Sequence, residues 1–190
     1  MFKLDLETGM LTYFSGFLSS NVYLIVIDGQ AVAVDCGMPW TAKNVLTYLK
    51  KYNLRLKHIF LTHSHFDHIM GVSKLKKKLN VNVFAYYESK HGDFRLQDGN
   101  IIKILDDKLS FLVIHTGIHR LDHVLFYEKH NKLLFIGDHL VTPTTLKMIR
   151  KRTNSIPKII LPGHGRPYTL NNSSFPENHG EAVFAKNDGS

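Results

Sequence analysis

A six-residue segment concentrates side chains that bind metal ions. It reads His63-Ser64-His65-Phe66-Asp67-His68 and directly follows a short apolar run that is typical of a strand. Imidazole nitrogen and carboxylate oxygen are ligand types that suit zinc, iron or manganese. Side chains two positions apart in an extended segment point the same way, so His63 and His65 are expected to share one metal ion. Asp67 and His68 then face a second ion where the loop enters a helix.

The same segment resembles the H-x-H-x-D-H signature of the metallo-β-lactamase superfamily. Further segments resemble other motifs of that family in the same order along the chain: Val34-Asp35-Cys36-Gly37, His115-Thr116-Gly117-Ile118-His119, Phe135-Ile136-Gly137-Asp138 and Leu161-Pro162-Gly163-His164-Gly165. The resemblance runs from about Tyr23 to Pro167. It implies an α+β fold, an αββα sandwich of two mixed β-sheets flanked by helices.

By position, the resemblance also implies a set of metal ligands. The first metal would be held by His63, His65 and His119, the second by Asp67, His68 and His164, and Asp138 would bridge the two. His115 and His123 stay as alternatives to His119, because Gly117 and Ile118 replace the proline and glycine of the family's H-T-P-G-H. Asp138 and His164 are only 26 positions apart, which is shorter than in many relatives and predicts an open pocket.

This ligand set predicts hydrolysis. Two metals ~3.5–4 Å apart hold a shared water and lower its pKa from 15.7 toward ~7, so that hydroxide is available to attack a carbonyl or phosphoryl centre. Asp67 and Asp138 are the predicted catalytic residues, with Asp67 orienting the nucleophile or passing a proton. Asp35 and Asp122 are candidates for hydrogen bonding to the ligands, with a plain capping role as the alternative.

The elements that must position these residues follow from alternation and spacing. Asp28-Gly29 and His130-Asn131 indicate hairpin turns, and helices are expected over Thr41 to Tyr52, with Thr41 as N-cap, Gly71 to Leu79 and Thr145 to Arg152. The predicted strands are Leu11 to Phe17, Asn21 to Ile27, Gln30 to Val34, Lys57 to Thr62, Asn82 to Tyr86, Asn100 to Ile104, Leu109 to Ile114, Val124 to Lys129, Lys132 to Ile136 and Lys158 to Leu161. We expect one domain over residues 1–170 and a polar, mobile tail over 171–190.

Composition excludes some classes of protein. No apolar run approaches the ~20 residues that span a bilayer, and the N-terminus does not resemble a signal peptide, so a cytoplasmic protein without a membrane partner is expected. The single cysteine, Cys36, excludes an intramolecular disulfide and is expected to be a packed residue rather than a nucleophile. The formal net charge of +8 includes two basic clusters, Lys74 with Lys76 to Lys78, and Lys147 with Arg150 to Arg152. Each is a solvated helix face or a site for an anionic partner.

Several functions remain in competition. The first hypothesis is hydrolysis of a small ester, either a thioester or a lactone, with two divalent metal ions, zinc favoured over iron or manganese. The runner-up is a metal-dependent phosphodiesterase or nuclease acting on RNA or DNA, which the basic clusters favour. A non-catalytic binding protein and a single-metal oxygenase-like relative are further alternatives. The sequence leaves the oligomeric state open, with a homodimer as one candidate because such dimers are the commonest assembly.

Overall fold

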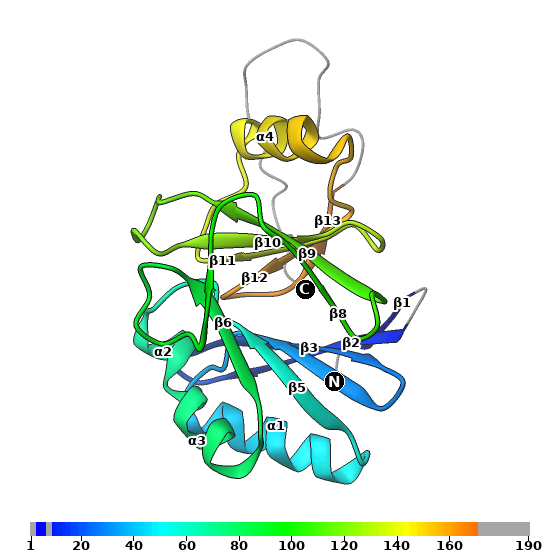
Figure 1. Ribbon diagram of the computed structural model, residues 1–190, viewed down its shortest axis with the longest axis vertical. Helices are drawn as coiled ribbons and strands as arrows, with labels where there is room; N and C mark the ends of the chain where they lie inside the picture. The colour runs from blue at the N-terminus through cyan, green and yellow to red at the C-terminus, as the bar shows by residue number, and fades with distance from the viewer. Residues whose placement is uncertain (1–2, 7–8, 171–190) are drawn as a thin grey trace, which may run out of the picture.

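Alternating apolar residues build two packed β-sheets. The structure is a computed structural model that describes residues 3–6 and 9–170 (Figure 1). One sheet has the strand order β1-β2-β3-β4-β5-β6-β7 and the other has the order β13-β12-β11-β10-β9-β8. Both are mixed: in the first sheet β4 to β7 run parallel to one another while β3 pairs with β4 antiparallel, and in the second β11 runs parallel to β12 while the other pairs are antiparallel.

The first sheet contains β1 (Lys3–Leu6), β2 (Gly9–Gly16), β3 (Ser19–Ile27), β4 (Gln30–Val34), β5 (Arg55–Phe60), β6 (Asn82–Tyr86) and β7 (Phe94–Leu96). The second contains β8 (Ile101–Ile104), β9 (Leu109–His115), β10 (Val124–Glu128), β11 (Leu133–Gly137), β12 (Ile159–Pro162) and β13 (Tyr168–Thr169). The helices are α1 (Pro39–Lys51), α2 (Phe66–Ile69), α3 (Gly71–Lys78) and α4 (Pro143–Thr153).

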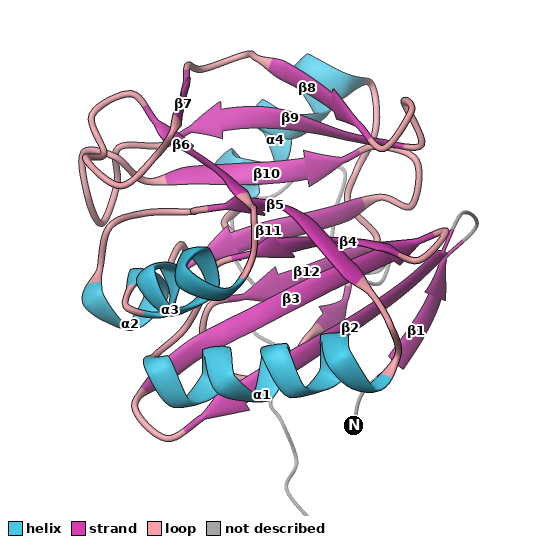
Figure 2. Cartoon of the chain, turned by 60° about the horizontal axis from the view of Figure 1, so that its bottom comes forward, coloured by secondary structure: helices cyan, strands magenta, loops and turns pink. Residues whose placement is uncertain are grey.

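Three clusters of buried residues hold the layers together. Between the sheets, Phe60 of the first packs against Phe111 and Phe126 of the second. Beneath the first sheet, α1 and α3 supply Val45 and Leu75 to a second cluster. Above the second sheet, α4 covers the outer face (Figures 1 and 2). This order of helix, sheet, sheet and helix is the αββα sandwich that the sequence predicted.

Two helices begin earlier than predicted. Thr41 is not the N-cap of α1, because the helix starts at Pro39 after Met38, and the Thr41 hydroxyl donates instead to Ser19. Proline suits this first position, where the missing N–H would have no helical partner. The last helix also starts at a proline, Pro143, and Thr142 caps it by accepting from the backbone N–H of Thr145.

The strand predictions were close but incomplete. The tight turn at Asp28-Gly29 is present, with positive φ at both residues and the pair Ile27↔Gln30 closing it. The short strands β1, β7 and β13 were not predicted, and β7 and β13, with three and two residues, are too short to carry a readable alternation. The predicted tail over 171–190 lies outside the described residues. In the described part of the chain, no helix is both long and apolar enough to cross a bilayer.

Candidate metal centre

All seven predicted ligands meet where strands end. His63 and His65 lie in the loop after β5, and Asp67 and His68 belong to α2, which follows at once. The other three ligands come from the later part of the chain: His119 from the loop between β9 and β10, Asp138 from the residue after β11, and His164 from the loop after β12. The site therefore joins the two sheets.

One group of ligand atoms comprises His63, His65, His119 and Asp138. Nδ1 of His65 and Nε2 of His119 are 2.9 Å apart. Oδ2 of Asp138 lies 3.4 Å from Nε2 of His119 and 3.6 Å from Nε2 of His63. Imidazole nitrogens that converge this closely around a carboxylate oxygen suit a shared cation.

The second group comprises Asp67, His68 and His164. Oδ2 of Asp67 lies 3.0 Å from Nε2 of His164 and 3.8 Å from Nε2 of His68. Asp138 also reaches this group, since its Oδ1 lies 3.1 Å from Nε2 of His68 and 3.6 Å from Nε2 of His164. One carboxylate thus presents Oδ2 to the first group and Oδ1 to the second.

The donor chemistry of these residues fits divalent metal ions. Nε2 of His63 is buried and has no hydrogen-bond partner among the described residues, although it points at Asp138. A buried nitrogen without a partner is costly, and a metal bond would satisfy it. Nitrogen and carboxylate oxygen donors, with no sulfur, match zinc, iron or manganese rather than a thiolate-selective metal.

Asp35, which follows β4, orients two of the imidazoles. Its Oδ2 accepts a hydrogen bond from Nδ1 of His68 at 2.8 Å and another from the Thr62 hydroxyl at 2.8 Å. Because that hydroxyl donates to Asp35, its oxygen can accept from Nδ1 of His63, 3.1 Å away. Both histidines then present Nε2 to the site, which is the arrangement expected of ligands with hydrogen-bonded partners.

Charge and burial act in opposite directions at these side chains. Burial lowers the pKa of His68, but Asp35 and Asp138 outweigh it and raise that pKa to about 10. Burial would raise the pKa of the Asp138 carboxyl, but the neighbouring imidazoles of His63 and His68 hold it well below its usual range. Asp138 is therefore a carboxylate at neutral pH.

Two glycines let the backbone approach the centre. A Cβ on Gly163 would lie 2.6 Å from Oδ1 of Asp138 and 2.7 Å from Cε1 of His68. A Cβ on Gly137 would lie 2.7 Å from Oγ1 of Thr62, and Gly137 has a φ of +51°. Both positions therefore require glycine for steric reasons.

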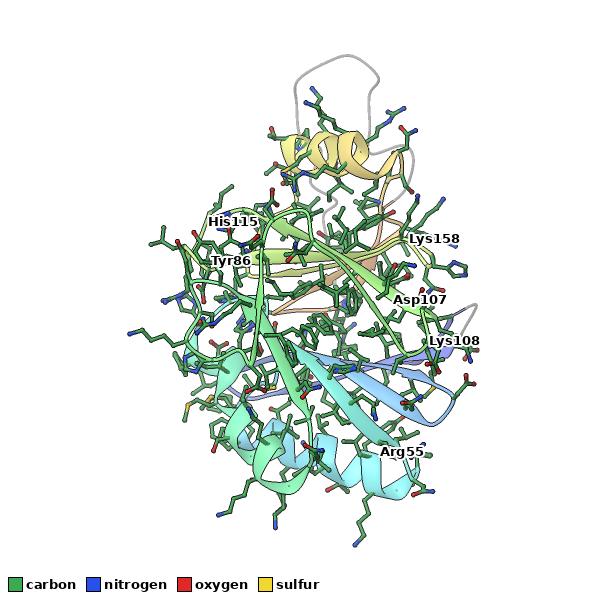
Figure 3. The ribbon with its side chains drawn as sticks, viewed as in Figure 1. Arg55, Tyr86, Asp107, Lys108, His115 and Lys158 are labelled. Atoms are coloured by element: carbon green, nitrogen blue, oxygen red, sulfur yellow. The ribbon has the colours of Figure 1, made fainter. Side chains whose placement is uncertain are left out.

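The two alternatives to His119 lie elsewhere. The ring of His115 stacks on Tyr86 with centroids 4.2 Å apart, and its Nε2 lies 2.7 Å from the carbonyl oxygen of Leu121 (Figure 3). His123 is buried behind His63, and its Nδ1 lies 3.0 Å from the Thr116 hydroxyl. Burial and the neighbouring histidines lower the pKa of His123 to about 2, so its ring is neutral.

Other polar residues at the site were not singled out from the sequence. The Ser20 hydroxyl donates to the carbonyl of Asp67 at 2.9 Å, and the Asn21 side chain donates to the carbonyls of Pro162 and Gly165. These two residues tie β3 to α2, which carries Asp67, and to the loop that carries His164. The available signal was a polar pair at the start of an otherwise apolar strand, which predicts buried hydrogen bonding rather than surface exposure.

Asp122 contacts no predicted ligand side chain. Its buried carboxylate accepts a hydrogen bond from Ser64, and its Oδ1 lies 3.3 Å from Nε of Arg120. It thus joins the loop of His119 to the loop of His63 and His65. Beside it lies an open pocket of about 610 Å³, lined by Ser64, Glu88, Lys90, His91, His119, Arg120, Leu121 and Asp122.

Comparison with known proteins agrees with this geometry. A hydroxyacylglutathione hydrolase of Pelagibacter ubique is 31% identical over 173 residues, covering 83% of this chain and 71% of the relative. One of Psychromonas ingrahamii is 36% identical over 122 residues, covering 63% of this chain but only 47% of the relative. The chain thus spans from about half to 71% of the length of these relatives. Their names agree with the sequence-based assignment to the hydrolases.

Solved structures show the same fold. The B3 metallo-beta-lactamase BLEG-1 superposes with a TM-score of 0.71 at 24% identity, covering 84% of this chain and 94% of that one. ETHE1 from Myxococcus xanthus gives a TM-score of 0.70 at 21% identity, covering 84% and 79%. Residues 15–174 of this chain match the family model of the metallo-beta-lactamase superfamily. The chain is therefore a member of the metallo-beta-lactamase superfamily.

Proposed function

We propose that this protein is a metal-dependent hydrolase of a small thioester, with a lactone as the second member of the same ester class. The observation that carries the proposal is the position of Asp138, whose two oxygens face separate groups of nitrogen and oxygen donors. The relatives named hydroxyacylglutathione hydrolase favour a thioester of glutathione over other esters. A lone buried cysteine also suits action in the reducing cytoplasm.

In this proposal the seven residues hold two divalent cations, with zinc the first choice for a site of imidazoles and carboxylates. His63, His65 and His119 would hold one cation and Asp67, His68 and His164 the other, while Asp138 has one oxygen facing each group. When bound, such a pair of cations polarises a carbonyl oxygen and makes hydroxide available at neutral pH.

The remaining steps belong to the chain itself. Asp138 and Asp67 are the catalytic carboxylates. Asp138 holds the two groups of ligand residues next to each other. Asp67 accepts a proton from the attacking water and returns it to the leaving thiolate. His65, His119 and His164 form the exposed side of the centre, with side chains 34%, 31% and 53% exposed, so substrate approaches over them. Asp35 and Thr62 keep the Nε2 atoms of the buried histidines directed at the centre.

Nucleic acid is the weaker candidate substrate. The cluster of lysines over 74–78 belongs to α3, which packs against α1 under the first sheet, and Lys76 pairs with Asp93 at 2.5 Å. The cluster over 147–152 belongs to α4, on the outer face of the second sheet. No residue of either cluster lines the pocket beside the metal centre.

The test is hydrolysis by the metal-loaded protein of three substrates: S-D-lactoylglutathione, a chromogenic lactone and bis(p-nitrophenyl) phosphate. Asp138→Ala is assayed beside the parent, with Asp5→Ala, which removes an exposed carboxylate of β1, as the matched control. Since loss of a ligand's hydrogen-bonding partner alone costs ~10–100-fold, loss of Asp138 should lower kcat/KM by more than ~100-fold.

We expect turnover of the thioester that a chelator abolishes and added zinc restores. Turnover of the phosphodiester alone would replace this proposal with the nuclease. Full activity after complete metal removal, or in Asp138→Ala, would reject the metal-dependent mechanism.

A further inference from the structure

The open pocket next to His119 has walls that are held in place. Ser64, between His63 and His65, donates to Asp122 and lies 2.9 Å from the hydroxyl of Ser89. These contacts tie together the loop after β5, the loop between β6 and β7, and the loop between β9 and β10. Since Ser64 and His119 both line the pocket, a substrate arm that extends from the first group of ligands enters it directly.

Arg95 holds the loop between β6 and β7 from behind. Its guanidinium donates to the backbone carbonyls of Tyr87 and Ser89. The backbone N–H of Ser89 also donates to the carbonyl of Tyr86 at 2.8 Å. The segment from Glu88 to His91 is thus anchored before any ligand arrives, and an anchored wall loses little conformational entropy on binding.

The two cations of the pocket have N–H donors that no described residue uses, and its buried carboxylate, Asp122, is already paired. Within the described residues, the Lys90 ammonium and the His91 ring have no hydrogen bond or ion pair, and Arg120 uses only Nε. Asp122 already accepts from Ser64 and Arg120, and Glu88 accepts from the Tyr87 hydroxyl at 3.1 Å. The unused donors therefore favour a negatively charged group in this pocket.

We propose that Lys90 and Arg120 form a subsite for a carboxylate on the arm of the substrate, with His91 as an additional donor. This inference rests on the proposed function, because it assumes that the scissile bond lies over the first group of ligands. Guanidinium and ammonium donors form strong charge-assisted hydrogen bonds with carboxylates. Glutathione carries two carboxylates, so a thioester of this thiol suits the subsite, whereas a neutral ester does not.

Binding is measured by calorimetry with S-hexylglutathione, a thioether that the enzyme cannot hydrolyse, and with its diethyl ester, in which both carboxylates are capped. The metal-loaded parent is compared with Lys90→Gln, Arg120→Gln and the double variant. Lys147→Gln, on the exposed side of α4, removes the same charge away from the pocket and is the matched control. Metal content is measured in every sample, because Arg120 adjoins His119.

Each exposed ion pair contributes up to about fivefold in Kd. The parent should therefore bind the free acid about 10-fold more tightly than the diester, each single variant should lose part of this preference, and the double variant should lose it. Lys147→Gln should keep it. Equal binding of the two probes by the parent, or an equal loss of preference in Lys147→Gln and Lys90→Gln, would overturn the subsite.

Hydrolysis of S-D-lactoylglutathione by the same samples separates this inference from the proposed function. Turnover without a preference for the free acid rejects the subsite and leaves the thioesterase proposal standing. A preference that depends on Lys90 and Arg120, without turnover of S-D-lactoylglutathione, supports the carboxylate subsite and rejects hydrolysis of the glutathione thioester.

Discussion

Asp35 and His68, which stand 33 positions apart in the chain, meet through a 2.8 Å contact between Oδ2 of the aspartate and Nδ1 of the histidine. Both side chains are buried. Because Asp35 accepts from Nδ1, the ring presents Nε2 to the site, where a bound metal ion would take the place of the Nε2 proton. Asp35 adopts a φ of +59°, an unusual backbone for a residue other than glycine, so its placement is supported by the contacts that it makes.

Asp35→Ala should weaken metal binding in the group that contains His68. Loss of a hydrogen-bonded partner of a ligand typically costs ~10–100-fold in metal affinity. Competition with a chromophoric chelator would measure this, with Asp5→Ala as the control and Asp35→Asn as the variant that keeps the side-chain volume. An unchanged affinity for both metal equivalents in a folded Asp35→Ala protein would contradict the orienting role.

Gly163→Ala should prevent metal binding while the free energy of unfolding changes little. The added Cβ would meet Asp138 and His68 at 2.6 and 2.7 Å, whereas the backbone at Gly163 does not have a positive φ. Gly165→Ala is the contrasting variant, because Gly165 has a φ of +83° and open space around it. We expect Gly165→Ala to cost ~1 kcal/mol or more of stability and to keep its metal. The opposite pattern, with metal lost only in Gly165→Ala, would show that the close approach is unimportant.

Cys36 should be inert in the native protein. Its side chain is fully buried, and burial, with a smaller effect of Asp35, raises the pKa of the thiol. Since the thiolate is the reactive form, a thiol-specific chromogenic reagent at pH 8 should label Cys36 only after denaturation. Cys36→Ala should retain activity, and rapid labelling of the folded protein or an inactive but folded alanine variant would restore the nucleophile hypothesis.

His58 of β5 should make the fold less stable in mild acid. Burial, and then Lys57, lowers the pKa of His58 from 6.5, and its Nδ1 is buried without a hydrogen-bond partner among the described residues. The unfolded chain therefore binds this proton at a higher pH than the folded protein. The stabilisation is complete above pH ~6.5 and is lost as the pH falls from there toward the lower folded pKa.

Replacing His58 by phenylalanine removes this titration while keeping a ring beside Phe84, which the native imidazole contacts at a centroid distance of 5.5 Å. Denaturant unfolding at pH 7.5 and pH 5.5, each with saturating metal, measures the effect. The variant should lose less free energy of unfolding between the two pH values than the parent does. An identical or larger loss would show that His58 titrates alike in the folded and unfolded states.

The motifs of the sequence indicated both the fold and the seven residues that now lie together. The side chains of His63 and His65, two positions apart, point the same way in an extended chain, so their spacing predicts a shared site without any tertiary structure. Alternation likewise predicted the longer strands, because one buried face requires a period of two. Pro39 and Pro143 were the available signs of the true helix starts, and the apolar periodicity drew attention to later residues instead.

Only the tertiary structure decided which distant side chains pair. Sequence spacing did not reveal that Asp35 contacts Thr62 and His68 while Asp122 contacts Ser64 rather than a ligand. Nor did it reveal that the loop with Lys90 borders the pocket beside His119. These contacts depend on how the two sheets pack and on where each strand ends, which are set by burial over the whole molecule. The ligand types could thus be read from the chain, but their hydrogen-bonded supports and the chemistry of the neighbouring pocket required the packed sandwich.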